Sequence, residues 1–474
     1  MHKDINMGII IGNRGFFSDK ICQEGRGRLL AVLKQHNINP IILSENEGSS
    51  GSVKNRNDAI QCASLFKRHS EEIKGVIVSL PNFGDEKSIA QTLKMSELKV
   101  PVLIHAFNDD LSKLDYSHRR DSFCGKISVC NNLRQYGINY TLTTMHTCDP
   151  EAEDFHKDLD KFIRVCNVVD KIKNARIGLV GSRPSDFSTV RFSEKILEKN
   201  GISVEPIGLL DFMNKIKCLS EDHFEVRKAI QELNSYMDTT KVPPISISKM
   251  AKLLVVYRQW IKENDIDAVA FQCWDSIQNF LGINPCLVMS IMSNEGIPSA
   301  CESDVSGALS MYALQVASEL PTGLVDWNNN YNNEADKAVI FHCGNFPKRM
   351  YYCQGNACPK VSYPHILAST LGKDNTFGAI EGRIQPGKVT FLRLTTDDTQ
   401  GKIKGYISEG EVTEETLNTF GSWGVVKVKG LQDLMNYICT NGFEHHVAVS
   451  LSSVGDVLKE AFQNYFNWEV YCHN

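Results

Sequence analysis

The chain has 474 residues, 42% of them hydrophobic and 23% charged, with a formal net charge of −5 at pH 7. This length exceeds what one hydrophobic core supports, so we expect two to four domains. The composition predicts a globular protein without a basic surface for nucleic acid and without the ~20-residue apolar run of a membrane span.

The cysteines and the start of the chain bear on the compartment. The 15 cysteines include no Cys-x-x-Cys pair, and the closest two are Cys353 and Cys358. This scatter favours free thiols in a reducing compartment over a disulfide framework. A strand-like run begins at Met7 without a signal-peptide pattern before it. We therefore expect a cytoplasmic protein.

The first third of the chain alternates short apolar runs with helical patterns. Such runs joined by helices predict a parallel sheet covered on both faces. Strands are predicted at 7–11, 39–43, 75–80 and 101–105, with helices such as 28–35 and 59–73 between them. We expect these elements to form an N-terminal α/β domain over residues 1–165.

A second unit begins with the same pattern as the first. Arg176-Ile-Gly-Leu-Val-Gly-Ser-Arg matches Met7-Gly-Ile-Ile-Ile-Gly-Asn-Arg, since each has a strand, a glycine and an arginine two residues later. Further strands are predicted at 203–207 and 267–271, and helices around 188–200 and 247–264. The pattern predicts a middle α/β domain over residues 166–345, so that two doubly wound parallel-sheet domains stand in tandem.

The arginine that follows the first strand of each unit, Arg14 or Arg183, is not part of a complete dinucleotide fingerprint. The third glycine of that fingerprint is missing, so NAD binding is disfavoured. An arginine at the carboxyl edge of a parallel sheet can instead bind sugar hydroxyls or an anion.

After residue 345 the pattern changes to a period of two. The segments 389–395, 401–408 and 421–429 alternate apolar and polar residues between turns. This alternation predicts a C-terminal antiparallel β-barrel-like domain over residues 346–474. A helix near 430–441, a strand from 446 and a helix from 454 complete it.

Three polar residues stand where apolar runs meet turns or helix starts: Glu302, Asp326 and His446. Two carboxylates and an imidazole suit an open site for Mn²⁺ or Mg²⁺ better than structural zinc. Taken singly, Glu302 is better explained as an acid in the first turn of a helix and Asp326 as an ordinary turn residue. Because side chains alternate along a strand, the rings of His445 and His446 should point to opposite sides.

Two neighbouring residues admit more than one interpretation. His342 ends an apolar strand and is either a hydrogen-bonded core residue or part of the site. Cys301 precedes Glu302, but no sequence-local histidine supports a nucleophilic role for it.

Three segments resemble the L-fucose isomerase / L-arabinose isomerase family of aldose–ketose isomerases: Ala300-Cys-Glu-Ser-Asp, Leu324-Val-Asp-Trp and Glu444-His-His-Val-Ala-Val. The resemblance implies a metal-dependent isomerase acting through an enediol in carbohydrate metabolism. It places the metal, usually Mn²⁺ with Mg²⁺ or Co²⁺ as substitutes, on Glu302, Asp326 and His446. The two carboxylates would also transfer protons.

The same resemblance implies a homohexamer, with each pocket completed by the first domain of a neighbouring subunit. The arabinose branch has an extra histidine ligand where His342 stands, so His342 is a candidate fourth ligand or a substrate contact. Residues at strand ends beside these segments are predicted to bind the sugar, namely Arg14, Gln272, Trp274 and Asn345.

The sugar itself stays open at this point. L-Fucose, L-arabinose or another pentose, and a phosphorylated or sulfonated sugar, all fit the pattern. A non-catalytic sugar-binding protein of two α/β lobes is the alternative of a different class.

Overall fold

The computed structural model describes residues 4–355 and 357–473. The chain divides into two compact units. The first runs to Asp170 and includes Glu460–Asn467, and the second comprises Lys171–Lys459 and the residues from Trp468. Within the described ranges, no helix combines the length and apolar character needed to cross a membrane.

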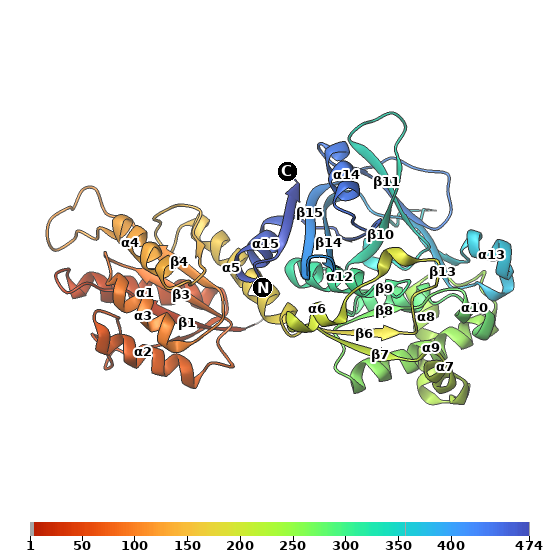
Figure 1. Cartoon of the computed structure of the whole chain (residues 1–474), viewed down its shortest axis with the longest axis horizontal. Helices are drawn as coiled ribbons and strands as arrows, with labels where there is room; N and C mark the ends of the chain where they lie inside the picture. Colours follow the sequence, from red (N-terminus) through yellow and green to blue (C-terminus); the bar gives the residue numbers. More distant parts are fainter. Residues whose placement is uncertain (1–3, 356, 474) are drawn as a thin grey trace. The chain divides into compact units, whose positions relative to one another are not determined.

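The first unit is built on a parallel sheet with the strand order β2-β1-β3-β4-β5 (Figure 1). Its strands are β1 (Ile5–Ile11), β2 (Ile38–Ile42), β3 (Gly75–Leu80), β4 (Val102–Ala106) and β5 (Thr141–Leu142). The helices are α1 (Asp19–Gln35), α2 (Arg56–Arg68), α3 (Glu86–Ser96), α4 (Ser122–Gln135) and α5 (Glu153–Ile172).

The strands of this sheet are apolar on both faces because helices cover both. Ile10 and Val78 belong to the core cluster shared with α2, α3 and α4. Ile9 and Ile77 belong to a second cluster, shared with α1 and α5. Two separate cores on one sheet are the arrangement that continuous apolar strands predict. The π-helical turn Glu460–Tyr465 also belongs to this unit, and its Tyr465 hydroxyl lies 2.7 Å from Thr141 Oγ1.

The second unit contains another parallel sheet, with the strand order β7-β6-β8-β9 (Figure 1). Its strands are β6 (Arg176–Val180), β7 (Ser203–Ile207), β8 (Ala268–Phe271) and β9 (Ser299–Cys301). The helices that accompany them are α6 (Glu194–Lys199), α7 (Leu209–Cys218), α8 (Phe224–Tyr236), α9 (Pro244–Glu263), α10 (Ser276–Leu281), α11 (Cys286–Asn294) and α12 (Val305–Ser318).

One predicted helix in this unit is shorter than the sequence suggested. The pattern at 188–200 predicts a continuous helix, but Ser188–Val190 form a separate 3₁₀ turn (η1) and α6 begins only at Glu194. Arg191 is extended and ends the 3₁₀ turn. Residues 181–193 therefore form a loop between β6 and α6, which we call the 181–193 loop.

The rest of the second unit is an antiparallel barrel. Its strands pair in the closed order β16-β11-β10-β17-β14-β15, with β15 returning to β16. The barrel strands are β10 (Gly323–Asn330), β11 (Lys337–His342), β14 (Gly387–Asp397), β15 (Lys402–Val412), β16 (Ser422–Lys427) and β17 (His446–Ser450). The predicted fold class of two parallel-sheet α/β regions followed by an antiparallel barrel is confirmed.

Shorter elements border the barrel. β13 (Ala379–Arg383) runs parallel to β16 with β12 (Lys360–Ser362) beside it, and β18 (Glu469–His473) runs parallel to β15. The helical segments are η2 (Lys348–Met350), α13 (His365–Leu371), η3 (Lys373–Asn375), α14 (Leu431–Thr440) and α15 (Gly455–Lys459).

Helix α12 connects the second sheet to the barrel. It packs on β8 and β9 on one side and on β14 and β17 on the other. A helix enclosed in this way has no polar face, and residues 305–314 of α12 are buried without interruption. Small residues allow this close packing, and the hydroxyl of Ser310 accepts a hydrogen bond of 2.8 Å from the backbone N–H of Leu394 on β14. The middle of α12 is thereby fixed against β14 of the barrel.

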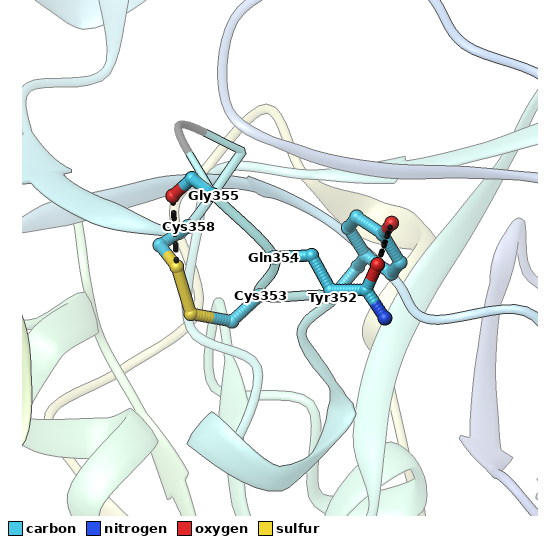
Figure 2. Close-up of a disulfide and its surroundings, with 5 residues drawn as sticks. All are labelled: Tyr352, Cys353, Gln354, Gly355 and Cys358. Carbon is cyan, nitrogen blue, oxygen red and sulfur yellow. Dashed lines mark hydrogen bonds between the residues drawn. A yellow bond between two sulfur atoms is a disulfide. The ribbon is translucent and has the colours of Figure 1, made fainter.

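One pair of cysteines departs from the expectation of free thiols. Cys353 and Cys358 form a disulfide, because the chain brings their Cα atoms to 4.0 Å (Figure 2). Beside it, the hydroxyl of Tyr352 donates a hydrogen bond of 2.9 Å to the side-chain oxygen of Gln354. The other cysteines, all within the described residues, are free. The prediction of free thiols was therefore wrong for this pair.

Candidate functional site

The three residues that the sequence singled out reach one place from different elements. Glu302 directly follows β9 of the parallel sheet, Asp326 lies on barrel strand β10, and His446 opens the neighbouring strand β17. Asp326 and His446 are direct partners in the antiparallel register of these strands. The site therefore forms where the edge of the parallel sheet meets the end of the barrel.

The side chains of this trio converge on the imidazole of His446. Its Nε2 atom lies 3.0 Å from Glu302 Oε2 and 3.4 Å from Asp326 Oδ1. All three atoms are buried, and among the described residues none of them has a partner with hydrogen-bond geometry. Buried polar atoms without such partners are rare, and the donor atoms of this trio that face one another are of the kinds that could hold a metal ion.

The charges at this point favour a cation. Burial by itself would lower the pKa of His446, but its contacts with Asp304 and Glu302 raise that pKa to about 10. Burial would likewise raise the pKa of Glu302, yet the close contact with the charged imidazole of His446 lowers that pKa to about 2. The site thus keeps a proton on an imidazole between carboxylates. A divalent cation can take the place of that proton, since its charge satisfies the same carboxylates.

The other ring nitrogen of His446 is held by Asp304, which the sequence analysis did not single out. Asp304 Oδ2 accepts a hydrogen bond of 2.9 Å from His446 Nδ1. Asp304 is fully buried, and despite that burial the charge of Arg393 and the contact with His446 hold its pKa well below the usual range. An ionised Asp304 can only accept, so one proton stays on Nδ1, and loss of the other proton from Nε2 leaves a lone pair there that can bind a metal.

Asp304 is itself held by a buried arginine. Arg393 on β14 donates to Asp304 Oδ2 at 2.6 Å and to Oδ1 at 3.1 Å. Its Nε and NH2 groups also contact Glu444, at 3.1 and 2.9 Å. Asp304 Oδ1 additionally accepts a bond of 2.7 Å from the backbone N–H of Gly307, so the same side chain caps α12. Gly307 is required here, because a Cβ atom would lie 2.5 Å from Asp304 Oδ2.

His342, at the end of β11, has its ring 5.7 Å from that of His446, measured between centroids. One ligand atom from each of Glu302, His342 and His446 lies within 4.8 Å of the others. However, His342 Nδ1 accepts a hydrogen bond of 2.9 Å from the backbone N–H of Cys343. The tautomer that accepts this bond has its proton on Nε2, which can then donate a hydrogen bond to a neighbouring group. The prediction that His342 is a fourth ligand or a substrate contact stays a prediction.

The two adjacent histidines do not point to opposite sides, so that prediction was wrong. The rings of His445 and His446 are 4.5 Å apart, and His445 Nε2 lies 3.6 Å from Asp326 Oδ1. The alternation rule fails because His445 lies in a bend before β17 begins. His445 is 42% exposed, whereas His446 is buried.

Aromatic side chains border the cluster. The indole N–H of Trp274, which follows β8, donates a hydrogen bond of 3.0 Å to Glu302 Oε1. Phe187 from the 181–193 loop has its ring 5.8 Å from that of His446 and 6.1 Å from that of Trp274. Trp274 therefore orients one oxygen of Glu302 and leaves the other facing His446.

The remaining residues predicted to bind the sugar make local contacts. The side-chain oxygen of Gln272 accepts a bond of 2.9 Å from the backbone N–H of Ser182 and so holds the start of the 181–193 loop. Asn345 is buried, and its amide nitrogen lies 3.1 Å from the sulfur of Cys301. Arg14 belongs to the first unit, where it stacks 4.1 Å from the ring centroid of Phe83 and pairs with Glu86.

The backbone at the first carboxylate is strained. Glu302 and Ser303 have φ angles of 63° and 58°, a left-handed conformation that is unfavourable for both side chains. Strain of this kind persists where the surrounding structure enforces it, often at functional sites. Here it turns the chain sharply between β9 and α12 and directs Glu302 towards the barrel.

Comparison with known proteins identifies relatives of both ends of the chain. The family model described as "Fucose/sulfoquinovose isomerase, N-terminal domain" matches residues 8–173, and "L-fucose isomerase, C-terminal domain" matches residues 340–473. Together these matches cover more than half of the chain. His342 and His446 lie in the second match, whereas Glu302 and Asp326 lie between the two.

Curated relatives carry the name sulfoquinovose isomerase. The protein from Clostridium sp. (strain MSTE9) is 28% identical over 229 residues, 48% of this chain and 50% of its own length. Those from Alkalicoccus urumqiensis and Priestia aryabhattai are 27% and 24% identical, over 41% and 58% of this chain and 44% and 59% of their own lengths. The chain thus spans about half the length of the curated relatives it matches.

Proposed function

Because the chain belongs to the fucose/sulfoquinovose isomerase family, we propose that it is a metal-dependent aldose–ketose isomerase. The observation that carries the proposal is the convergence of three buried atoms without hydrogen-bond partners among the described residues: Glu302 Oε2, Asp326 Oδ1 and His446 Nε2. Leaving buried polar atoms without hydrogen-bond partners costs folding free energy, so the fold alone gives no reason for these three atoms to face one another.

The donor set fits a divalent cation. Two carboxylate oxygens and one imidazole nitrogen suit Mn²⁺, with Mg²⁺ or Co²⁺ as substitutes, and we assign Glu302, Asp326 and His446 as the residues that hold it. When bound, such a cation polarises a sugar carbonyl and stabilises negative charge on neighbouring oxygens. We propose that His342 donates a hydrogen bond from Nε2 to the sugar and is not a fourth ligand, because its Nδ1 accepts from the backbone.

The protein's own groups would move the protons. Aldose–ketose interconversion removes a proton from C2 and delivers one to C1, with a matching exchange between O1 and O2. Glu302 and Asp326 approach the site from different structural elements, and we assign one carboxylate to accept a proton and the other to donate one. Trp274 holds Glu302 in place through its indole N–H. Phe187 covers the histidines and keeps water away from the reacting carbons.

The names of the relatives favour sulfoquinovose over L-fucose, L-arabinose or another pentose as the substrate. By resemblance to the family we propose a homo-oligomer, with a hexamer as the expected state. Light scattering that gives a monomer at working concentration would contradict this. A cytoplasmic location is proposed as well, because most of the cysteines are free thiols.

A direct test uses chelated protein and a panel of aldoses. The protein is stripped of metal, incubated with each aldose, and assayed for ketose before and after Mn²⁺ is added back. We expect ketose formation only with the cation. Binding of a sugar without isomerisation, or turnover that chelation leaves unchanged, would reject the proposal.

A further inference from the structure

The 181–193 loop places aromatic and basic side chains beside the metal cluster. Its Phe187 has the ring 5.5 Å from that of His445 and 5.8 Å from that of His446. The start of the loop is held by the hydrogen bond from Ser182 to Gln272. The loop therefore contributes to the wall of the site through Phe187.

A small cavity of about 170 Å³ opens beneath this loop. Its lining residues come from the loop, from β6 and from the turn after β9: Leu179, Arg183, Val190, Arg191, Phe192 and Ser303. Ser303 is the residue after Glu302, so the cavity begins one residue, or about 3.8 Å of backbone, from a proposed metal ligand. The cavity and the metal cluster therefore share the turn that follows β9.

Both arginines of the cavity are positioned by their own loop. Arg183 donates from NH1 to the carbonyl oxygens of Pro184 and Ser185, at 2.8 and 3.2 Å. Arg191 donates from Nε to the carbonyl oxygen of Ser188 at 2.9 Å. Within residues 4–355 and 357–473, neither guanidinium forms an ion pair with a carboxylate, and no described carboxylate lines the cavity. Each guanidinium is thus held in place with N–H donors to spare.

Ser303 supplies an independent sign of a ligand. Its side chain is 2% exposed, and its hydroxyl has no hydrogen-bond partner among the described residues. A buried hydroxyl normally has a partner, so one that lacks a partner and lines a cavity points to a molecule that supplies it. Two guanidiniums and a hydroxyl match the oxygens of a tetrahedral oxyanion.

We propose that this cavity is an oxyanion site that binds the acidic group of the substrate, at the end of the sugar remote from the carbons that are isomerised. The proposal rests on the proposed function and deepens it, because it makes the substrate an anionic aldose with a terminal sulfonate or phosphate. Arg183 and Arg191 are then the residues that select this class over neutral sugars.

The test compares matched sugars on the Mn²⁺-loaded protein. Sulfoquinovose and glucose 6-phosphate carry the acidic group on C6, and quinovose is the neutral 6-deoxy counterpart. We expect the wild type to prefer an anionic sugar, and the better of the two acids identifies sulfonate or phosphate. Loss of a charge-assisted hydrogen bond in Arg183→Gln or Arg191→Gln should lower the anionic-to-neutral ratio of kcat/KM by about tenfold to a hundredfold, mainly through KM.

Arg227→Gln is the matched control, because Arg227 is an exposed arginine of α8 in the same unit that does not line the cavity. It should leave the ratio unchanged. If the wild type turns over quinovose as well as the acids, or if the variants at positions 183 and 191 keep the wild-type ratio, the oxyanion site is refuted while the isomerase proposal stands.

If no sugar is turned over, the proposed function fails, and a second measurement then tests the oxyanion site independently of turnover. Inorganic sulfate and methanesulfonate are titrated into the full-length protein, and its thermal unfolding is followed. Stabilisation of the wild type and Arg227→Gln that is lost in the Arg183→Gln/Arg191→Gln double variant supports the oxyanion site. Equal shifts in all three proteins, or no shift in any, would overturn it.

Discussion

Replacing Asp304 with asparagine tests how the protein prepares His446 for a metal. The capping bond from Gly307 and the bond from Arg393 NH2 favour the amide oxygen at the Oδ1 position, and the 2.6 Å bond that Arg393 NH1 donates to Oδ2 is then lost. The amide nitrogen then takes the place of Oδ2, where it faces Nδ1 of His446. An N–H₂ group can only donate, so the His446 proton moves to Nε2, the atom that faces Glu302 and Asp326.

Two effects of different size follow. Loss of a group that orients a ligating histidine typically lowers metal affinity about tenfold to a hundredfold, or about 1.4–2.7 kcal/mol. Removal of one partner from a buried ion pair costs about 3–5 kcal/mol of folding free energy. Because Arg393 keeps its two contacts with Glu444, at 2.9 and 3.1 Å, we expect the lower end of that range, about 3 kcal/mol.

Glu444→Gln is the matched control, since it also removes a charged partner of Arg393 but does not touch His446. Mn²⁺ affinity is measured by calorimetry, and stability by urea unfolding of the metal-free proteins. Both variants should lose stability, whereas only Asp304→Asn should lose Mn²⁺ affinity. Wild-type affinity in Asp304→Asn, or an equal loss of affinity in Glu444→Gln, would refute the orienting role of Asp304.

Three further predictions concern the metal cluster. Glu302→Gln should lower turnover by at least about a hundredfold because it removes a proton-transfer group, and near-normal kcat in a folded variant would take Glu302 out of the mechanism. In the metal-free protein the pKa of His446 is raised from 6.5 to about 10. Protonation of His446 therefore stabilises the metal-free fold, fully below pH 6.5, and this stabilisation is lost as the pH rises through 10. Calorimetry at pH 8 in two buffers of different ionisation enthalpy should therefore detect close to one proton released per Mn²⁺ bound, and no release would contradict the assignment. His342→Asn should keep Mn²⁺ affinity within about threefold and lose about tenfold in kcat/KM, whereas loss of metal binding equal to that of His446→Asn would make His342 a ligand.

Local patterns in the sequence predicted the elements on which the site is built. The short apolar runs of β1 and β3 form strands as predicted, because a strand buried on both faces needs no polar alternation. The period of two in β14 and β15 likewise predicted an antiparallel sheet. Glu302, Asp326 and His446 stood out because each follows or opens such a run, and resemblance to a known family supplied the link between them.

What the sequence could not supply were the partners that act on these residues from other elements. Asp304 reads locally as a helix cap, and Arg393 reads as one residue of a period-two strand, although the two form a buried ion pair across 89 positions. Nothing in the local pattern places His342 Nδ1 against its own backbone or breaks the alternation at His445. Arg183 was recognised as a residue that can bind an anion, but the cavity it shares with Arg191 and Ser303 was not.

The difference between the features that the sequence predicted and those that it did not has a physical cause. Strand and helix formation depend on the order of apolar and polar residues over a few turns of chain, and that order is written in the sequence. The protonation of an imidazole, the pairing of a buried charge and the room left beneath a loop depend on atoms brought together by packing α12 between the sheet and the barrel. Sequence therefore determined which elements form and which side chains end them, and tertiary structure decided what each side chain can bind.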